Sequence, residues 1–265
     1  MLSMNLKKFV KIIRLSKKEK KSPPKVSKGL KEKILDNTKS ILIALLIALL
    51  IRSFLVQAFY IPSASMKPNL LEGDYVFVTK YNYGYSHHSL PFSIPLIPSS
   101  RIFYHQPQRG DVLVFKYPGD NSTDYVKRLI GLPGDKIQII NSVLYINDKP
   151  LKRTFEKTIT VNGANFNVYK EYMENKSYKI WQIQDFAYYP VQFFGPIIVG
   201  KDQFFMMGDN RDMSKDSRFK DVGLVPKANL VGKGFLIFFS IDGSFLQFWK
   251  WFYGIRFERI FNLIN

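Results

Sequence analysis

The sequence predicts a mainly β protein that is preceded by one N-terminal transmembrane helix. Ile41–Ile51 is an unbroken apolar run. Beyond residue 60 the apolar residues fall in short β-rich runs that Gly, Pro and Asp separate, a pattern typical of strands. We find no long amphipathic helix pattern and no internal repeat. The 265 residues suffice for one large domain or two small ones.

Residues 1–37 are strongly basic. Residues 1–40 contain thirteen of the 39 lysines and arginines and three of the 21 acidic residues, so they carry +10 of the net charge of +18. Such a leader is typical of a nucleic-acid contact or of a cytoplasmic tail before a membrane span. A solvated, disordered tail without a ligand is a further interpretation. We expect a basic cytoplasmic tail and no nucleic-acid partner.

Residues 38–58 are expected to form the transmembrane helix. The eleven residues of Ile41–Ile51 would cover only about 16 Å of a hydrocarbon core about 30 Å thick. The helix must therefore extend beyond this run, with the charges of Lys39 and Arg52 reaching toward the lipid headgroups. A buried helix of a soluble protein is the alternative, against which the one-sided basic flank argues. This flank places the N-terminus in the cytoplasm and the chain from Tyr60 onward on the far side.

The rest of the chain is expected to form a β domain, as a barrel or two sheets, in two parts (59–140 and 201–265). A smaller inserted β-rich segment, residues 141–200, separates them, and much of it is polar and irregular. The predicted strands are 75–79, 111–115, 125–130, 136–140, 143–146, 204–207 and 235–239. Asn147-Asp148 is expected to close a hairpin. The aromatic and basic tail, residues 245–264, suggests either a core element or a rim at the membrane interface.

The residue types present exclude several kinds of site. The chain has no cysteine, so a disulfide, a thiolate nucleophile and a cysteine-based zinc site are impossible. Its three histidines, His87, His88 and His105, lie in one Pro/Ser/Tyr-rich stretch without the spacing of a metal site. We expect surface-loop histidines, no metal and no cofactor. A Ser-His-Asp triad is weakly supported for the same reason.

Three blocks of residues carry the chemistry. They are Ile61-Pro62-Ser63-Ala64-Ser65-Met66, Tyr125-Val126-Lys127-Arg128 with Gly131–Asp135, and Gly208-Asp209-Asn210-Arg211 with Ser214-Lys215-Asp216-Ser217-Arg218. A serine, a lysine and a Ser/Asp/Arg cluster in this order resemble bacterial type I signal peptidase, a family of peptidases with a Ser/Lys dyad. The resemblance covers about residues 41–265, and blocks of this length make coincidence improbable.

The resemblance implies a role for four polar residues. Ser65 corresponds to the nucleophile and Lys127 to the general base, which must be desolvated because only a neutral amine can accept a proton. Ser63 corresponds to the serine whose hydroxyl joins the backbone N–H of Ser65 in the oxyanion hole. Ser214 occupies the position of a serine that hydrogen-bonds the lysine. Strand alternation would place Lys127 and Leu129 on one face.

The charged residues of the third block are expected to be architectural. Asp216 and Arg218 would form an ion pair, and Asp209 would be available to Arg128. A carboxylate beside Lys127 would raise its pKa, which is the wrong direction for a base. The family cleaves after small residues, which implies shallow apolar pockets beside the serine. The corresponding residues are Phe59, Ile61, Pro62, Met66, Leu70, Tyr125 and Val126.

The resemblance thus implies a membrane-anchored serine endopeptidase that cleaves N-terminal signal peptides from translocated preproteins. Its partners would be these signal peptides and the lipid bilayer. It would cross the inner (plasma) membrane once, with the catalytic domain on the outer, periplasmic side. The alternatives are a peptidase of the same clan with a regulatory substrate, and a non-catalytic anchored module that binds a partner or tethers nucleic acid. The non-catalytic module would not need Ser65 or Lys127.

Overall fold

The computed structural model describes residues 30–90, 93, 101–184, 192–242 and 251–264. Most of the basic tail therefore lies outside the described residues. The chain divides into two compact units, Met1–Leu46 and Ile47–Asn265. Helix α2, Leu30–Phe54, contains one stretch, Asn37–Phe54, that is apolar and long enough to cross a membrane by length and composition. Its side chains from residue 37 to 52 are exposed, which argues against the core helix of a soluble protein.

The helix ends four residues before the expected boundary at residue 58. Val56–Tyr60 forms strand β1 instead, which pairs antiparallel with β2, Asp74–Thr79, from Val56 opposite Thr79 to Tyr60 opposite Tyr75. The apolar character of residues 54–59 suits a half-buried strand as well as a helix, so composition alone did not separate the two.

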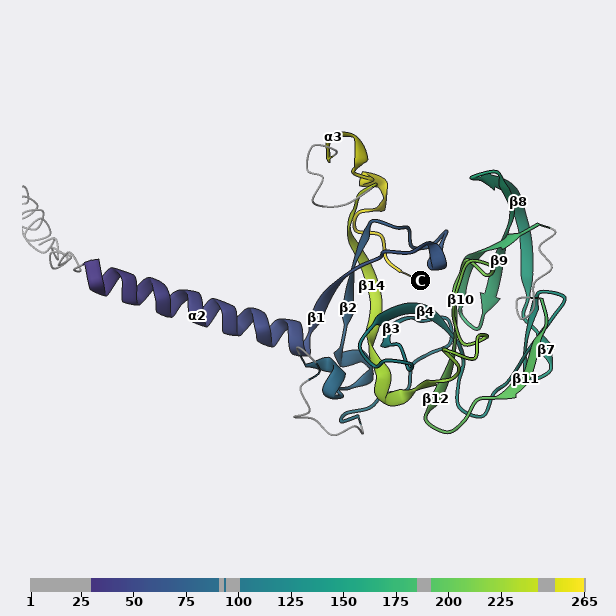
Figure 1. The fold of residues 1–265 in the computed structure, drawn as a ribbon, viewed down its shortest axis with the longest axis horizontal. Helices are drawn as coiled ribbons and strands as arrows, with labels where there is room; N and C mark the ends of the chain where they lie inside the picture. Colours follow the sequence, from purple (N-terminus) through teal and green to yellow (C-terminus); the bar gives the residue numbers. More distant parts are fainter. Residues whose placement is uncertain (1–29, 91–92, 94–100, 185–191, 243–250, 265) are drawn as a thin grey trace, which may run out of the picture. The chain divides into compact units, whose positions relative to one another are not determined.

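The β domain contains three sheets of antiparallel strands (Figure 1). The largest has the order β1-β2-β14-β3-β4-β12-β13, the second β11-β5-β6-β7 and the third β10-β9-β8. The strands after β2 are β3 Val112–Lys116, β4 Asp124–Gly131, β5 Lys136–Ile140, β6 Val143–Ile146, β7 Lys149–Pro150, β8 Arg153–Val161, β9 Ala164–Met173, β10 Lys176–Ile183, β11 Phe194–Ile198, β12 Gln203–Met207, β13 Val225–Pro226 and β14 Leu230–Ser240. The mainly β prediction is confirmed. All seven predicted strands are present; six have ends within one residue of the prediction, and β14 begins five residues earlier than predicted.

Strand β4 is covered on both of its faces. Alternate side chains of a strand point to opposite sides of the sheet, and here the two sides belong to different apolar clusters. Val126 packs against a cluster that includes Val112 and Val114. Tyr125 and Leu129 belong to a second cluster with Leu113 and Phe115. This alternation agrees with the prediction that residues 127 and 129 share one face of the strand. Residue 127 therefore lies on a strand that other residues cover on both sides.

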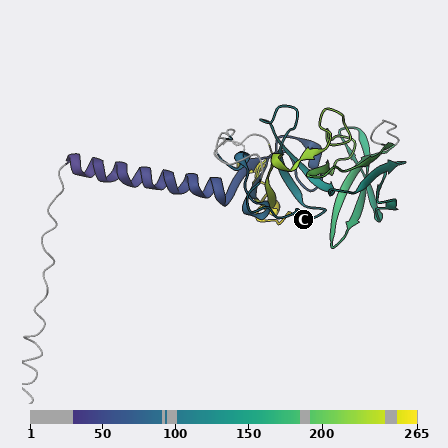
Figure 2. The ribbon, with the colours of Figure 1, turned by 90° about the horizontal axis from the view of Figure 1, so that it is seen from below.

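The inserted segment, residues 141–200, is more regular than expected. It contains β6 to β11, and Asn147 and Asp148 both have the positive φ angles of a tight turn, 53° and 66°, between β6 and β7. Strand β5 belongs to the same sheet as β6, so this smaller part begins near Lys136, before residue 141. Most residues of β8 are exposed, and a strand without a buried face lacks the apolar alternation that predicts strands. Figures 1 and 2 show β8 and β9 on one side of the β domain, and β1 and β2 on the other.

The C-terminal segment returns along β14. Isolated bridges join Leu236 to Leu263 and Ile241 to Ile255. The short helices α3, Trp251–Gly254, and η7, Phe257–Arg259, precede the end of the chain. Tyr253 and Phe257 are 96% and 73% exposed, so this part of the tail is not a core element. The beginning of the predicted tail, residues 245–250, lies outside the described residues.

Candidate active site

Ser65 lies in a short 3-10 helix, η1, Ala64–Met66, directly after β1. The carbonyl of Ser65 accepts the backbone N–H of Asn210 at 3.1 Å, and the Asn210 side chain donates to the carbonyl of Ala64 at 3.2 Å. A Cβ atom on Gly208 would lie 2.5 Å from the Ser65 carbonyl oxygen, so only glycine permits this approach. The first and third sequence blocks are therefore in direct contact.

Lys127 reaches Ser65 from the middle of the large sheet. It lies on β4, between β3 and β12, and its Nζ donates to Ser65 Oγ at 2.7 Å. Both residues are buried, with 5% and 7% exposure. The ring of Tyr125 lies 5.4 Å from the amine. The structure thus brings the second block to the other two, and it pairs the predicted nucleophile with the predicted base.

Burial lowers the pKa of Lys127 to about 8 from 10.5. Loss of solvent is the main cause, because a buried amine is less stable when charged. The charges of Asp216 and Asp209 raise this pKa, and the charge of Arg218 lowers it. About one such lysine in ten would be neutral at pH 7, whereas a free lysine is almost wholly charged.

The two acids near Lys127 are paired with arginines. Arg128 contacts Asp209 through Nε and Nη2, each at 2.7 Å, and Arg218 contacts Asp216 through Nε and Nη2, each at 2.8 Å. Both ion pairs are buried. Burial alone would raise the pKa of Asp216, but the charge and hydrogen bonds of Arg218, with the Gly208 N–H, lower it. Asp216 is therefore held as the charge partner of Arg218, and Asp209 contacts Arg128, which are the pairings that the sequence predicted.

The two accessory serines differ in how they relate to the dyad. Ser63 Oγ lies 3.3 Å from Ser65 Oγ, so the hydroxyl is beside the reacting atom. Ser214 is 4% exposed and packs against Gly208. No hydrogen bond from Ser214 Oγ to Lys127 is formed among the described residues. The expected contact between this serine and the lysine is therefore missing from this geometry, and its lysine-orienting role stays a prediction.

A cavity of about 510 Å³ opens beside the dyad. Six of the seven predicted pocket residues line it. These are Phe59, Ile61, Pro62, Met66, Tyr125 and Val126. Leu70 does not line it, because it is fully buried in the apolar core with Val76 and Val78. The chain also places Tyr60, Thr123, Asp124 and Lys215 in this lining. Their adjacency to predicted residues was the only signal in the sequence that could have identified them.

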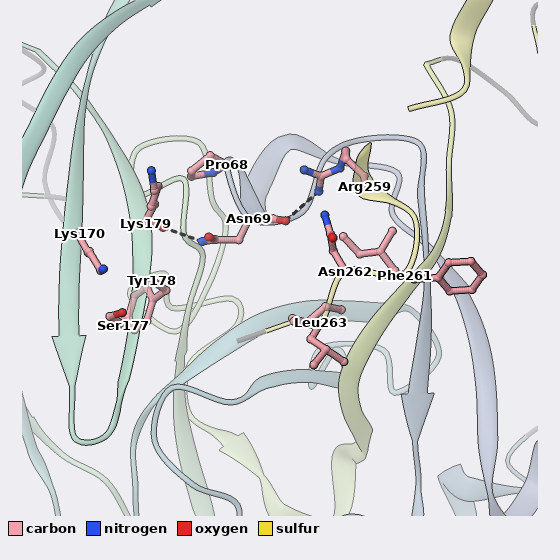
Figure 3. A pocket seen from close by; sticks show the side chains of 12 residues that line it. Pro68, Asn69, Lys170, Ser177, Tyr178, Lys179, Arg259, Phe261, Asn262 and Leu263 are labelled. Atoms are coloured by element: carbon pink, nitrogen blue, oxygen red, sulfur yellow. Dashed lines mark hydrogen bonds between the residues drawn. The ribbon is translucent and has the colours of Figure 1, made fainter. Parts of the chain in front are cut away.

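A second cavity, of about 590 Å³, is lined by Pro68 and Asn69, which follow η1 in the chain, and by residues of β10 and of the C-terminal segment (Figure 3). Asn69 is bonded on two sides of this cavity. Its side-chain amide donates to the backbone carbonyl of Lys179 at 2.7 Å, and its backbone carbonyl accepts a hydrogen bond from Arg259 at 2.9 Å. Asn69 also donates to Asp209 at 2.7 Å. Arg259 pairs with Asp74 at 2.6 Å. These bonds hold the segment after Ser65 between β10 and the C-terminal segment.

Comparisons with known proteins identify the family to which this chain is similar. The family model described as "Signal peptidase, peptidase S26" matches residues 34–239. Signal peptidase I of Rickettsia typhi is 42% identical over 83% of this chain and 90% of its own length. The enzymes of Rickettsia conorii and Rickettsia canadensis are 43% and 42% identical over 83% and 86% of this chain, and over 89% and 92% of their own lengths. A crystal structure of a signal peptidase I from Enterococcus faecalis covers 49% of this chain and 97% of its own, with 26% identity and a TM-score of 0.31.

Proposed function

The chain belongs to the signal peptidase family, peptidase S26, and is a peptidase, and we propose that it removes signal peptides from preproteins by means of a Ser65–Lys127 dyad. The observation that carries the proposal is the 2.7 Å contact between Lys127 Nζ and Ser65 Oγ. This contact lies in a cavity with apolar walls, as a substrate with small side chains beside the cleaved bond requires. Similarity to signal peptidase I of Rickettsia species supports the choice of substrate.

The acylation step uses the neutral amine. Lys127 accepts the hydroxyl proton of Ser65 while Ser65 Oγ attacks the carbonyl carbon of the scissile bond. The negative charge that develops on the carbonyl oxygen is stabilised by the backbone N–H of Ser65 and by the Ser63 hydroxyl. The Lys127 ammonium then donates its proton to the leaving amine, the C–N bond breaks, and the mature chain departs. An ester between the signal peptide and Ser65 remains.

Deacylation repeats these roles with water. Lys127 removes a proton from a water molecule, whose oxygen attacks the ester carbonyl. Collapse of the second tetrahedral intermediate breaks the bond to Ser65 Oγ, which takes the proton back from Lys127. The signal peptide leaves with a new carboxylate. The Asp209 and Asp216 carboxylates hold the arginines in this scheme and transfer no proton.

The same proposal includes membrane anchoring by α2. The apolar stretch Asn37–Phe54 supports it by length and composition, and the basic residues before it support a cytoplasmic N-terminus. Ser65 follows the last helical residue by eleven positions, at most about 40 Å of extended chain. The catalytic residues would thus act near the outer surface of the inner membrane, where a membrane-inserted signal peptide presents its cleavage site.

A cleavage assay tests this function. The purified full chain should shorten a purified preprotein at one position, and Ser65→Ala and Lys127→Ala should each abolish this cleavage while both variants keep the melting behaviour of a folded β domain. Cleavage of one regulatory protein but not of signal peptides would favour a same-clan peptidase with another duty. If the unmodified chain binds preprotein but does not cleave it, the result would favour the non-catalytic binding module.

A further inference from the structure

A third cavity, of about 230 Å³, lies where α2 ends and the β domain begins, and we call it the Arg52 cavity. Its lining residues are Arg52, Gln57, Phe59, His88, Leu90, Ser93, Lys116, Asp124 and Val231. Arg52 is the basic residue of the last turn of α2. The function proposed above does not use Arg52, Lys116 or His88, so the purpose of this polar hollow is open.

The Arg52 cavity carries an excess of positive charge. Its one carboxylate, Asp124, pairs with Lys116 at 2.9 Å, and Arg52 forms no ion pair among the described residues. Lys80 is 2% exposed nearby and donates to the carbonyl of Ser89 at 2.6 Å rather than to a carboxylate. Burial and the charges of Arg52 and Lys116, opposed by the charge of Asp124, together lower the pKa of Lys80 to about 8. Three basic side chains therefore lie in or near this cavity with one carboxylate among the lining residues.

Neutral polar groups complete the lining. His88 is 7% exposed, which corrects the expectation of a surface-loop histidine, and its Nδ1 lies 3.1 Å from Ser93 Oγ. Burial, followed by the charges of His87, Lys116 and Arg101, lowers the pKa of His88 to about 4. This histidine is therefore an uncharged hydrogen-bonding group at neutral pH. Two cations with a neutral imidazole, a hydroxyl and an amide form a donor set that suits a tetrahedral oxyanion.

We propose that the Arg52 cavity binds the phosphate group of an anionic lipid headgroup, with Arg52 and Lys116 as its charged ligands. A guanidinium suits phosphate because it offers two parallel N–H donors. The choice of a lipid rests on the proposed membrane anchoring, because Arg52 lies two residues before the end of the apolar stretch Asn37–Phe54. This position brings the cavity to the level of the headgroups.

Occupancy of this cavity is expected to affect cleavage. Phe59 and Asp124 line both the Arg52 cavity and the cavity beside the dyad. Asp124 begins β4, which carries Lys127 three residues later. A phosphate that shares Lys116 with Asp124 would change the charge at the wall of the substrate cavity. The bound lipid would thus contact β1 and β4, the two strands whose residues Phe59 and Asp124 line both cavities.

The test uses the full chain in vesicles of phosphatidylcholine, with and without phosphatidylglycerol, and an uncharged soluble peptide substrate. We expect phosphatidylglycerol to increase cleavage saturably and to raise the thermal unfolding midpoint. Arg52→Gln should keep the basal rate in phosphatidylcholine but need about tenfold more phosphatidylglycerol, because it loses charged hydrogen bonds to the ligand. Arg52→Lys should retain most of the response. Lys157→Gln, which removes one charge from an exposed position on β8, should respond as the unmodified chain does.

Inorganic phosphate at constant ionic strength separates the two sources of the ligand. A response to it in phosphatidylcholine vesicles that Arg52→Gln abolishes would support the phosphate site with a soluble occupant. An equal response to phosphatidylglycerol in Arg52→Gln and the unmodified chain overturns the proposal, and so does an equal loss in Arg52→Gln and Lys157→Gln. The midpoint shift is measurable in Ser65→Ala, so the lipid site can be judged even where the proposed peptidase activity fails.

Discussion

Arg128 and Asp209 form a two-point ion pair with both contacts at 2.7 Å, and the arginine is fully buried beside Lys127 in the chain. Neighbouring positions of one strand therefore hold a cation that must stay charged and an amine that must lose its charge. The fold separates them because alternate side chains of β4 point to opposite faces. Arg128 pairs with the Asp209 carboxylate, whereas Lys127 donates a hydrogen bond to the hydroxyl of Ser65 at 2.7 Å.

The pH dependence of cleavage should report this arrangement. Lys127 is active as a base only when neutral, and its pKa is lowered to about 8. We expect kcat/KM to rise with pH through an apparent pKa near 8 and to level off above it. Rates over pH 5–10 with a peptide that has no titrating group would measure this limb.

Histidine variants provide the control for this profile. His88 has a pKa lowered to about 4 and lines a different cavity from the dyad. Replacing His87, His88 or His105 by glutamine should leave the limb in place. A limb near pH 6.5 that one of these replacements removes would transfer the role of base to histidine.

The effects of Ser65→Ala and Lys127→Ala should not add. Each variant should lose nearly all activity, and the double variant should be little worse than either one, because the two side chains act as one unit across a single hydrogen bond. Single-turnover rates of the three variants would measure this. Substantial activity in either single variant contradicts the dyad.

The sequence predicted the dyad better than its surroundings. Ser65 and Lys127 lie 62 positions apart, yet each is embedded in a block whose order in the chain resembles a known family. Their contact depends on β1 and β4 lying in one sheet, which residue patterns do not reveal. The Asp209 and Asp216 ion pairs were predictable because charges in a buried block need partners.

The errors arose where local patterns are ambiguous. Leu70 lies close to Ser65 in the chain, but the segment turns inward after η1 and buries it in the core. The helix end at Phe54 and the exposed strand β8 were missed because neither shows a decisive apolar period. The burial of His88 depends on residues far along the chain, such as Val231 in the same cavity, and no local signal reports it.

Ser63→Ala should lower kcat by a factor of about ten to a thousand with little change in KM, as the loss of one oxyanion donor does. The Ser63 hydroxyl lies 3.3 Å from Ser65 Oγ, so a small rotation directs it at the developing oxyanion. Steady-state kinetics with the unmodified chain as reference would settle the role. An unchanged kcat would leave Ser63 as a turn residue.

Asp216→Asn should reduce stability by about 3–5 kcal/mol, because it leaves Arg218 buried without its charge partner. It should also move the ascending limb of the pH profile to lower pH, since the Asp216 charge raises the pKa of Lys127 and the Arg218 charge lowers it. Thermal melting and the pH profile measure the two effects. Asp202→Asn, which breaks an exposed pair with Lys227, is the control and should change stability little. Lost activity with an unshifted melting midpoint would indicate a direct catalytic part for Asp216.

Lys127→Met should abolish cleavage and yet stabilise the fold at pH 7. The pKa of Lys127 is lowered from 10.5 to about 8, so below pH 8 the folded chain holds a buried charge at a cost of about 3 kcal/mol. Removing the buried charge should stabilise the folded chain, and loss of the hydrogen bond to Ser65 should offset about 1 kcal/mol of this gain. Between pH 8 and 10.5 the unfolded chain binds the proton and the folded chain does not, so the stability of the unmodified protein rises with pH across this window.

The advantage of the methionine variant should therefore be largest near pH 7 and should disappear as the pH approaches 10. Denaturant unfolding of both proteins in one detergent at pH 7 and pH 10 measures the difference. Lys157→Met, at an exposed position of β8, should change stability little at either pH, because an exposed lysine keeps its ordinary solvation. A Lys127→Met variant that is less stable at pH 7, or a difference that does not vary with pH, would mean that Lys127 is not held as a destabilised cation. The lowered pKa on which the base role depends would then be wrong.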